Sequence, residues 1–237
     1  MKLYIVATPI GNLEDITYRA VRILQEADYI ICEDTRVTSK LLQHYEIKKP
    51  LLSYHQRSKQ NKTEQIIEKL KTGSDLALVT DAGTPGISDP GNELVSAARQ
   101  AMRKEIESGE MQIIPVPGVS ALTTLASVAG INLQKFIFLG FPPNKKGRQT
   151  FFKEVVKNIE ENDYPIFYYD SPYRVVKNLQ LLQEFVPDVK VIIGRELTKK
   201  FEEIKSGSVG EVLKYYDEEG QGKLKGEFVI LLQNLKS

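Results

Sequence analysis

The feature that most constrains the fold is a regular alternation of two kinds of segment. Short apolar, β-branched stretches alternate with longer ones whose apolar residues recur at helical spacing. We expect strands at 3–8, 28–32, 76–79, 113–116, 136–139, 166–169, 189–193 and 227–232. We expect helices at 16–27, 37–45, 63–70, 89–104, 120–129, 148–159, 172–185 and 209–215. This alternation predicts the α/β class with mainly parallel sheets.

The length of the chain predicts two domains. Its 237 residues exceed the roughly 150 of an average domain. The proline and glycine residues at 115–118 separate two halves of similar size. We therefore expect an N-terminal α/β domain over residues 1–116 and a C-terminal α/β domain over residues 117–237.

Composition excludes several classes of protein. A single cysteine, Cys32, permits no internal disulfide, and with only two histidines a zinc cluster is not expected. Lys and Arg number 32 against 31 Asp and Glu, so any nucleic-acid binding must be local. No apolar run approaches the ~20 residues of a membrane span, and the N-terminus is too short for a secretory signal. We expect a cytoplasmic protein that does not contact a membrane.

Common catalytic and nucleotide-binding motifs are absent from the sequence. It contains no G-x-x-x-x-G-K-[ST] loop, G-x-G-x-x-G fingerprint, G-x-S-x-G elbow or H-E-x-x-H pair. An ordinary P-loop enzyme, dinucleotide-binding enzyme, α/β-hydrolase or zinc protease is therefore not expected.

Three loops rich in glycine and proline follow expected strands, at 7–12, 80–91 and 115–121. Ligands of open α/β sheets bind at the carboxyl ends of the strands. Glycine permits close approach of the backbone to a ligand, and proline rigidifies the turn. Plain turn formation explains any one loop, but three at one edge favour a ligand site. Asp81, directly after an expected strand, is placed to accept hydrogen bonds from a bound hydroxyl or ammonium group.

These loops belong to an ordered set of motifs that covers nearly the whole chain. The set resembles the RsmI-type small-subunit rRNA (cytidine-2'-O)-methyltransferases, which belong to the tetrapyrrole methylase superfamily. The matching stretches are ATPIGNLEDIT at 7–17, CEDTR at 32–36, SYH at 53–55, VTDAGTP at 79–85, ISDPG at 87–91, PGVSA at 117–121, GFPP at 140–143, SPYR at 171–174, GRELTK at 194–199, FEE at 201–203 and GEFV at 226–229.

The resemblance implies two α/β domains with S-adenosylmethionine (SAM) in the interdomain cleft, and a homodimer. It implies methyl transfer to the 2'-hydroxyl of a cytidine in the decoding region of 16S rRNA, with no metal required. The residues that it places in the SAM site are Pro9, Ile10, Gly11, Asp81, Gly83, Thr84, Pro85, Ile87, Ser120, Ala121, Tyr169, Glu196 and Glu227.

A ribose hydroxyl is a poor nucleophile, so its proton must be removed or polarised. The candidate residues are Glu33, Asp34, Lys199, Glu202 and Glu203, with His55 as a further candidate base. Arg36 either holds a phosphate or pairs with a neighbouring carboxylate. Lys199 acts as a base only if its pKa is lowered.

Two segments are locally basic. Residues 36–62 carry seven Lys or Arg against one acidic residue, and residues 135–157 carry six against one. The second segment contains Lys145, Lys146 and Arg148 in a loop with Phe141 and Phe151 nearby. Such a loop favours binding to an RNA backbone, and the alternative is a solvated surface.

The chain departs from the family pattern in several places. Asp170 and Tyr173 stand where Glu and His are frequent, Val119 stands where Pro is common, and no C-terminal helical extension is expected. Two alternatives therefore stay open. One is a SAM methyltransferase of the same superfamily acting on a tetrapyrrole or another small molecule. The other is a non-catalytic rRNA-binding assembly factor.

Overall fold

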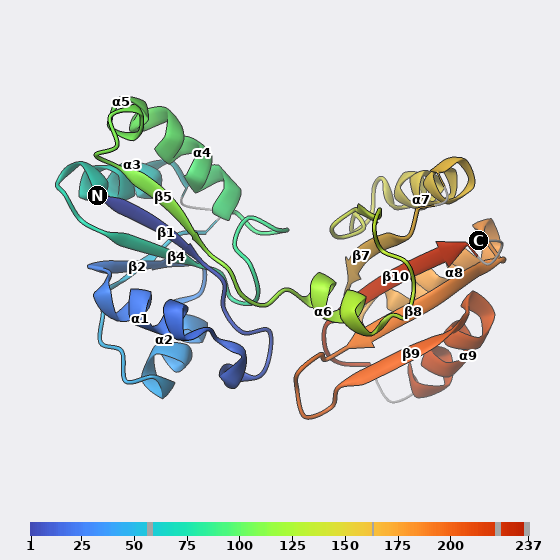
Figure 1. The fold of residues 1–237 in the computed structure, drawn as a ribbon. Helices are drawn as coiled ribbons and strands as arrows, with labels where there is room; N and C mark the ends of the chain where they lie inside the picture. Colours follow the sequence, from blue (N-terminus) through green and yellow to red (C-terminus); the bar gives the residue numbers. More distant parts are fainter. Residues whose placement is uncertain (56–58, 163, 221–223, 235–237) are drawn as a thin grey trace. The chain divides into compact units, whose positions relative to one another are not determined.

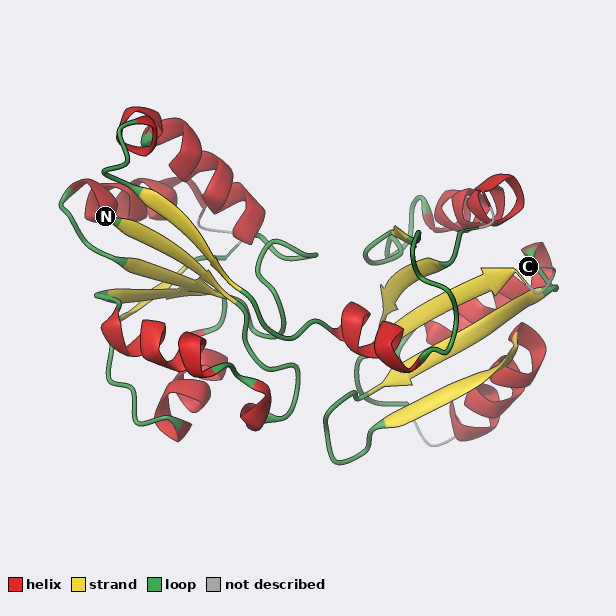
Figure 2. Cartoon of the chain, viewed as in Figure 1, coloured by secondary structure: helices red, strands yellow, loops and turns green. Residues whose placement is uncertain are grey.

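The computed structural model describes residues 1–55, 59–162, 164–220 and 224–234. The chain divides into two compact units, Met1–Ser120 and Ala121–Ser237 (Figure 1). Strands and helices alternate along both units, which confirms the α/β class (Figure 2). Among the described residues, no helix is long and apolar enough to cross a membrane.

The first unit is built on a five-stranded sheet in the order β3-β2-β4-β1-β5, and all of its pairings are parallel. The strands are β1 (Lys2–Val6), β2 (Tyr29–Cys32), β3 (Leu51–Ser53), β4 (Leu76–Val79) and β5 (Gln112–Val116). The helices are α1 (Tyr18–Glu26), α2 (Thr35–His44), α3 (Lys59–Lys71), α4 (Gly91–Ala101) and α5 (Arg103–Glu107), with a 3₁₀ turn at Leu13–Asp15.

Helices cover both faces of this sheet. Apolar residues of α1 and α2 pack on one face against alternate strand residues such as Val6, Ile30 and Ala77. Residues of α3 and α4 pack on the other face against Leu3 and Leu76. Both faces are buried, so the strands read as nearly continuous apolar runs, as parallel strands do.

The second unit has a five-stranded sheet in the order β6-β7-β10-β8-β9. Its strands are β6 (Ile137–Phe138), β7 (Ile166–Asp170), β8 (Val189–Arg195), β9 (Glu203–Ser208) and β10 (Phe228–Asn234). Only β6 and β7 pair in parallel, and the other three pairings are antiparallel. The expectation of parallel pairing is therefore wrong for most of this sheet. The link from β8 to β9 is too short for a crossover between parallel neighbours.

The helices of the second unit are α6 (Ala121–Val128), α7 (Arg148–Asn162), α8 (Val175–Phe185) and α9 (Val209–Gly220). Helices α7, α8 and α9 form one core with alternate strand residues, among them Tyr168, Ile193 and Ile230. Helix α6 packs against β10. Because β6 and β7 are parallel and each leads into a helix, the starts of α7 and α8 lie at the same edge of the sheet.

Candidate functional site

The carboxyl ends of β2, β4, β1 and β5 lie next to one another, because these strands are parallel neighbours. The loops that follow them carry the predicted residues Glu33–Arg36, Asp81–Ile87, Pro9–Gly11 and Ser120. The fold therefore gathers these predicted residues of the first unit at one sheet edge. Within the loops, Pro9, Ile10, Pro85 and Ser120 are buried, whereas Gly11 and Ile87 are exposed.

Hydrogen bonds tie the three glycine- and proline-rich loops together. Thr8 and Gly83 exchange two backbone hydrogen bonds of 2.9 Å each, across the loops after β1 and β4. The Thr8 hydroxyl donates to the Thr80 carbonyl at 3.0 Å. The Thr84 hydroxyl donates to the Val119 carbonyl at 3.1 Å and so joins the loop after β5. The edge is thus preorganised by backbone contacts.

Glycine is favoured at two points in these loops, at Gly83 because of its positive φ and at Gly118 because of a close approach. Gly83 has φ +82°, and a Cβ there would contact Ile10 Cγ2 at 3.5 Å. A Cβ on Gly118 would lie 2.9 Å from Ala7 Cβ, which is closer than real atoms pack. Gly118 thus lets the loops after β1 and β5 approach each other, and Gly83 supplies the left-handed backbone of the loop after β4.

Asp81 is a half-buried carboxylate at the end of β4. Its Oδ1 accepts a hydrogen bond from the backbone N–H of Asp34 at 3.1 Å, which links the loops after β4 and β2. Burial raises the pKa of Asp81, and the neighbouring Asp34 and Asp89 carboxylates raise it further. A partly desolvated acceptor of this kind gains more from a donor ligand than a fully hydrated one.

Glu33 lies beside this carboxylate. Burial raises the pKa of Glu33, and the charges of Asp81 and Asp89 add to the effect, while His55 opposes it. Glu33 and Asp89 line a small cavity of about 10 Å³, the size of one water molecule. A carboxylate with a raised pKa is a stronger base than an ordinary one.

Asp34 and Arg36 form a local ion pair. The Arg36 guanidinium donates to both carboxylate oxygens of Asp34, with Nη2 at 2.6 Å from Oδ2. The Asp34 side chain also caps α2 through the N–H of Arg36 at 2.8 Å. These hydrogen bonds lower the pKa of Asp34 to about 2, so it is a weak base at neutral pH.

A second group of predicted residues meets at one end of β8 in the second unit. Lys199 Nζ lies 2.7 Å from Glu196 Oε1 and 2.9 Å from Glu227 Oε2. The backbone N–H of Glu227 donates to the Glu196 carboxylate at 3.0 Å. Glu196 and Thr198 adopt left-handed φ angles of 49° and 67°, which costs free energy for residues with a side chain.

These contacts determine the charge of Lys199. Burial alone lowers the pKa of Lys199, but its hydrogen bonds to Glu196 and Glu227 outweigh burial, and the pKa is raised. The condition for Lys199 to act as a base, a lowered pKa, is therefore not met. Of the other candidates here, Glu203 accepts hydrogen bonds from Tyr215 and Tyr216, and Glu202 accepts one from the N–H of Thr198.

We predict that Gly226→Ala disrupts this group and destabilises the protein. Gly226 has φ +101°, and a Cβ there would lie 2.4 Å from Glu196 Cγ. Gly130 in the same unit also has a positive φ, +66°, but open space around it. Gly130→Ala should cost about 1 kcal/mol, and Gly226→Ala about 1–3 kcal/mol more. Equal losses in calorimetric unfolding would show that Glu196 moves aside without cost.

Tyr169 lies near the end of β7 within an aromatic group. Its ring centroid is 5.0 Å from that of Phe138 and 5.2 Å from that of Phe141. Phe141 is half exposed, so this group has a face open to solvent. Ala121 begins α6, directly after the point where the two units divide.

The predicted RNA-binding residues lie between β6 and α7. Lys145 and Lys146 are exposed, and Arg148 is half-buried at the first position of α7. The other basic segment includes Arg57, which lies outside the described residues. Among the described residues, no group of His, Cys, Asp or Glu is arranged to hold a metal ion.

Three contributors to these sites were not singled out from sequence. Thr8 bridges two loops, Gly226 makes room for Glu196, and Arg174 contacts the basic loop. All three fall inside the motifs quoted above. Which residue of each motif mattered depended on contacts between distant segments.

The glycine- and proline-rich loops at the carboxyl edge of a parallel sheet are typical of an α/β protein that binds a ligand there. Comparison with known proteins identifies the family. The model of the tetrapyrrole (corrin/porphyrin) methylases matches residues 2–213, and the chain belongs to this family. It is therefore a methyltransferase, as the sequence motifs indicated.

Curated relatives within the family carry a more specific name. The protein named ribosomal RNA small subunit methyltransferase I from Bacillus subtilis is 40% identical to this chain, and the match covers 98% of this chain and 74% of the relative. The protein of the same name from Thermotoga maritima is 42% identical, and the match covers 98% of this chain and 97% of the relative. The resemblance stated from the motifs is thereby confirmed.

Solved structures show the same fold at low identity. The methyltransferase CobJ aligns over 98% of this chain and 93% of its own with a TM-score of 0.68 and 18% identity. Uroporphyrin-III-C-methyltransferase from Thermus thermophilus aligns over 97% of this chain and 93% of its own, with a TM-score of 0.65 and 17% identity. At this identity the likeness supports the fold alone.

Proposed function

We propose that this protein transfers a methyl group from SAM to the 2'-hydroxyl of a cytidine in the decoding region of 16S rRNA. The observation that carries the proposal is the 40–42% identity, over nearly the whole chain, to relatives named for methylation of small-subunit rRNA. A ribosomal substrate also fits the expected cytoplasmic location.

The first unit offers a fitting site for SAM. The donor has hydroxyls and an ammonium group that need acceptors, and Asp81 is a half-buried acceptor at the sheet edge. Gly118 lets the loop after β5 approach the loop after β1, and the positive φ of Gly83 shapes the loop that carries Asp81. When bound, SAM supplies an electrophilic methyl group. The proposed SAM contacts are Pro9, Ile10, Gly11, Asp81, Gly83, Thr84, Pro85, Ile87, Ser120, Ala121, Tyr169, Glu196 and Glu227.

We assign the proton-accepting role to Glu33. Its raised pKa makes it a stronger base than Asp34, whose pKa is about 2. Arg36 keeps Asp34 ionised, and we propose that its exposed guanidinium also faces the RNA backbone. Lys199, held in its charged form, fixes Glu196 and Glu227 in place.

In the proposed enzyme, Lys145, Lys146 and Arg148 would contact RNA. The boundary between the two domains would lie at 115–118, and the enzyme would act as a homodimer. Light scattering of the purified protein tests the dimer directly.

The decisive experiment is methyl transfer from labelled SAM to small ribosomal subunits that lack the modification, followed by nucleoside analysis. We expect label in 2'-O-methylcytidine. Label absent despite SAM binding would favour a small-molecule substrate, and absence of both label and SAM binding would favour a non-catalytic assembly factor.

A further inference from the structure

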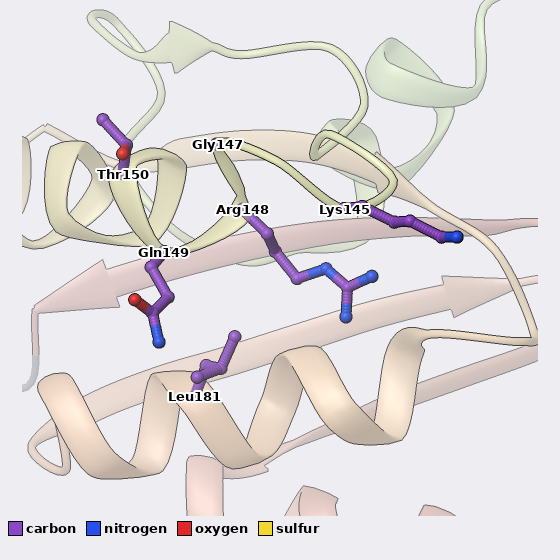
Figure 3. A pocket seen from close by; sticks show the side chains of 6 residues that line it. All are labelled: Lys145, Gly147, Arg148, Gln149, Thr150 and Leu181. Atoms are coloured by element: carbon purple, nitrogen blue, oxygen red, sulfur yellow. The ribbon is translucent and has the colours of Figure 1, made fainter.

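A pocket of about 470 Å³ lies in the second unit where α7 begins. It is lined by Lys145, Gly147, Arg148, Gln149, Thr150 and Leu181. Figure 3 shows Arg148 and Gln149 projecting from the start of α7 toward Leu181 on α8. The volume falls within the range of small-ligand pockets, roughly 300–1,000 Å³.

The lining of this pocket is cationic. It includes two basic residues and no acidic one. The nearby Asp170 is buried, and its carboxylate is already engaged by the Ser171 N–H at 2.7 Å and the Asn178 amide at 2.7 Å. Asp170 interacts electrostatically with Arg148 but does not line the pocket. The lining itself therefore carries only positive charge, as expected for a surface that meets an anion.

Arg148 is held in place but not saturated. One of its terminal nitrogens donates to the Asn144 carbonyl, while its buried Nε has no hydrogen-bond partner among the described residues. Arg174 donates to the Asn144 side chain. Two guanidinium groups thus contact Asn144. The buried Nε of Arg148 is closed to a ligand, so a ligand would meet the terminal nitrogens of its guanidinium. Planar forks of this kind match the oxygens of phosphate.

Exposed aromatic rings lie on the segments that adjoin the pocket. The Pro142 carbonyl accepts from Arg174 at 3.4 Å, which joins the loop after β6 to the loop after β7. Phe141 on the first loop is 50% exposed, and Tyr173 on the second is 87% exposed. Aromatic rings next to cations are the combination that holds single-stranded RNA, by stacking bases beside bound phosphates.

We propose that this pocket binds one nucleotide of a single-stranded RNA segment. The phosphate lies between Lys145 and Arg148, and the nucleoside extends toward Gln149 and Leu181. The Gln149 amide can donate to and accept from a base edge, so it would read sequence. The identity of the ligand as RNA rests on the proposed function, whereas the pocket and its charge do not.

The test compares two double variants of the full chain that lose the same charge. Lys145→Ala/Arg148→Ala empties the pocket of cations. Lys153→Ala/Lys157→Ala removes two exposed cations of α7 that do not line the pocket. Fluorescence anisotropy measures binding of a short single-stranded RNA from the decoding region over a range of salt concentrations.

We expect the pocket variant to lose about tenfold or more in affinity and to flatten the salt dependence by about one unit of slope. The control variant should lose about twofold or less. Equal losses in the two variants would overturn the proposal. Arg148→Ala also breaks a contact to Asn144. Lys145→Glu therefore serves as a second variant that leaves this contact intact. Unchanged RNA affinity in Lys145→Glu would also overturn the proposal.

Gln149→Ala separates the reading of sequence from simple charge attraction. It should reduce the preference among RNA sequences and leave the salt dependence unchanged. Methylation by the wild-type protein is measured separately. If the wild type methylates the subunit but the pocket variant binds RNA normally, the proposed nucleotide pocket is refuted and the proposed function is not. Pocket-dependent RNA binding without any methylation refutes the proposed function alone.

Discussion

Replacing Asp81 with alanine is expected to weaken SAM binding by at least about a hundredfold while the first unit stays folded. Asp81 is the half-buried acceptor at the end of β4. In the proposed site its loss would leave the donor groups of SAM without a charged partner. Isothermal calorimetry with SAM measures the change. Asp81→Asn keeps an acceptor for the Asp34 N–H and should still lose most of the affinity, because the charge is gone.

The same two strands supply a matched control at their other ends. Asp28, before β2, accepts a hydrogen bond from the Asp75 N–H, before β4, at 2.8 Å. Asp34 and Asp81 repeat this kind of contact after the two strands, at 3.1 Å. Asp28→Asn should therefore leave SAM affinity unchanged. Unchanged affinity in both Asp81 variants would refute the SAM assignment of this edge.

Glu33→Gln is expected to lower kcat by roughly 10²- to 10⁴-fold and to leave SAM affinity nearly unchanged. The pKa of Glu33 is raised by burial and by the charges of Asp81 and Asp89. Its amide analogue has similar size but cannot accept a proton. Single-turnover methylation of small ribosomal subunits measures the effect. An unchanged rate would exclude Glu33 as the base.

The pH dependence gives an independent check on Glu33. A base must be ionised, so the wild-type rate should fall as the pH falls through the raised pKa of Glu33. For stability the sign is opposite: a carboxyl with a raised pKa in the folded state contributes stability below its unfolded pKa, and this is lost as pH rises through the folded pKa. Glu33→Gln should therefore not destabilise the protein at neutral pH.

Asp34→Asn distinguishes the two neighbouring carboxylates. Its pKa of about 2 means that Asp34 stays ionised throughout the assay range, and its partners are Arg36 and the start of α2. This variant should weaken the capping of α2 and shift the pH profile of methylation only slightly to lower pH, because the charge of Asp34 is the smallest cause of the raised pKa of Glu33. Loss of methylation with Asp34→Asn, at an unchanged rate with Glu33→Gln, would transfer the role of base from Glu33 to Asp34.

Much of the fold follows from local sequence pattern. The strand at 76–79 and the starts of α7 and β7 agree with the expected positions, because their apolar runs are bounded by clear turns. Two strands were missed. β3 has three residues, which is too short to show the alternation of polar and apolar residues that predicts a strand. β9 has the sequence Glu-Ile-Lys-Ser-Gly-Ser, which is a polar edge strand with an interior glycine.

The sequence by itself determined the α/β class, the family, and the segments that carry the site, because strand and helix periods and ordered motifs are local properties of the chain. Only the tertiary structure decided the antiparallel pairing in the second sheet, the contact of Asp34 with Asp81, and the charged state of Lys199. Asp34 and Asp81 are 47 positions apart, and Lys199 is 28 positions from Glu227 although only three from Glu196. The physical reason is the same in each case. Pairing direction and pKa are set by neighbours in space, which no local pattern records.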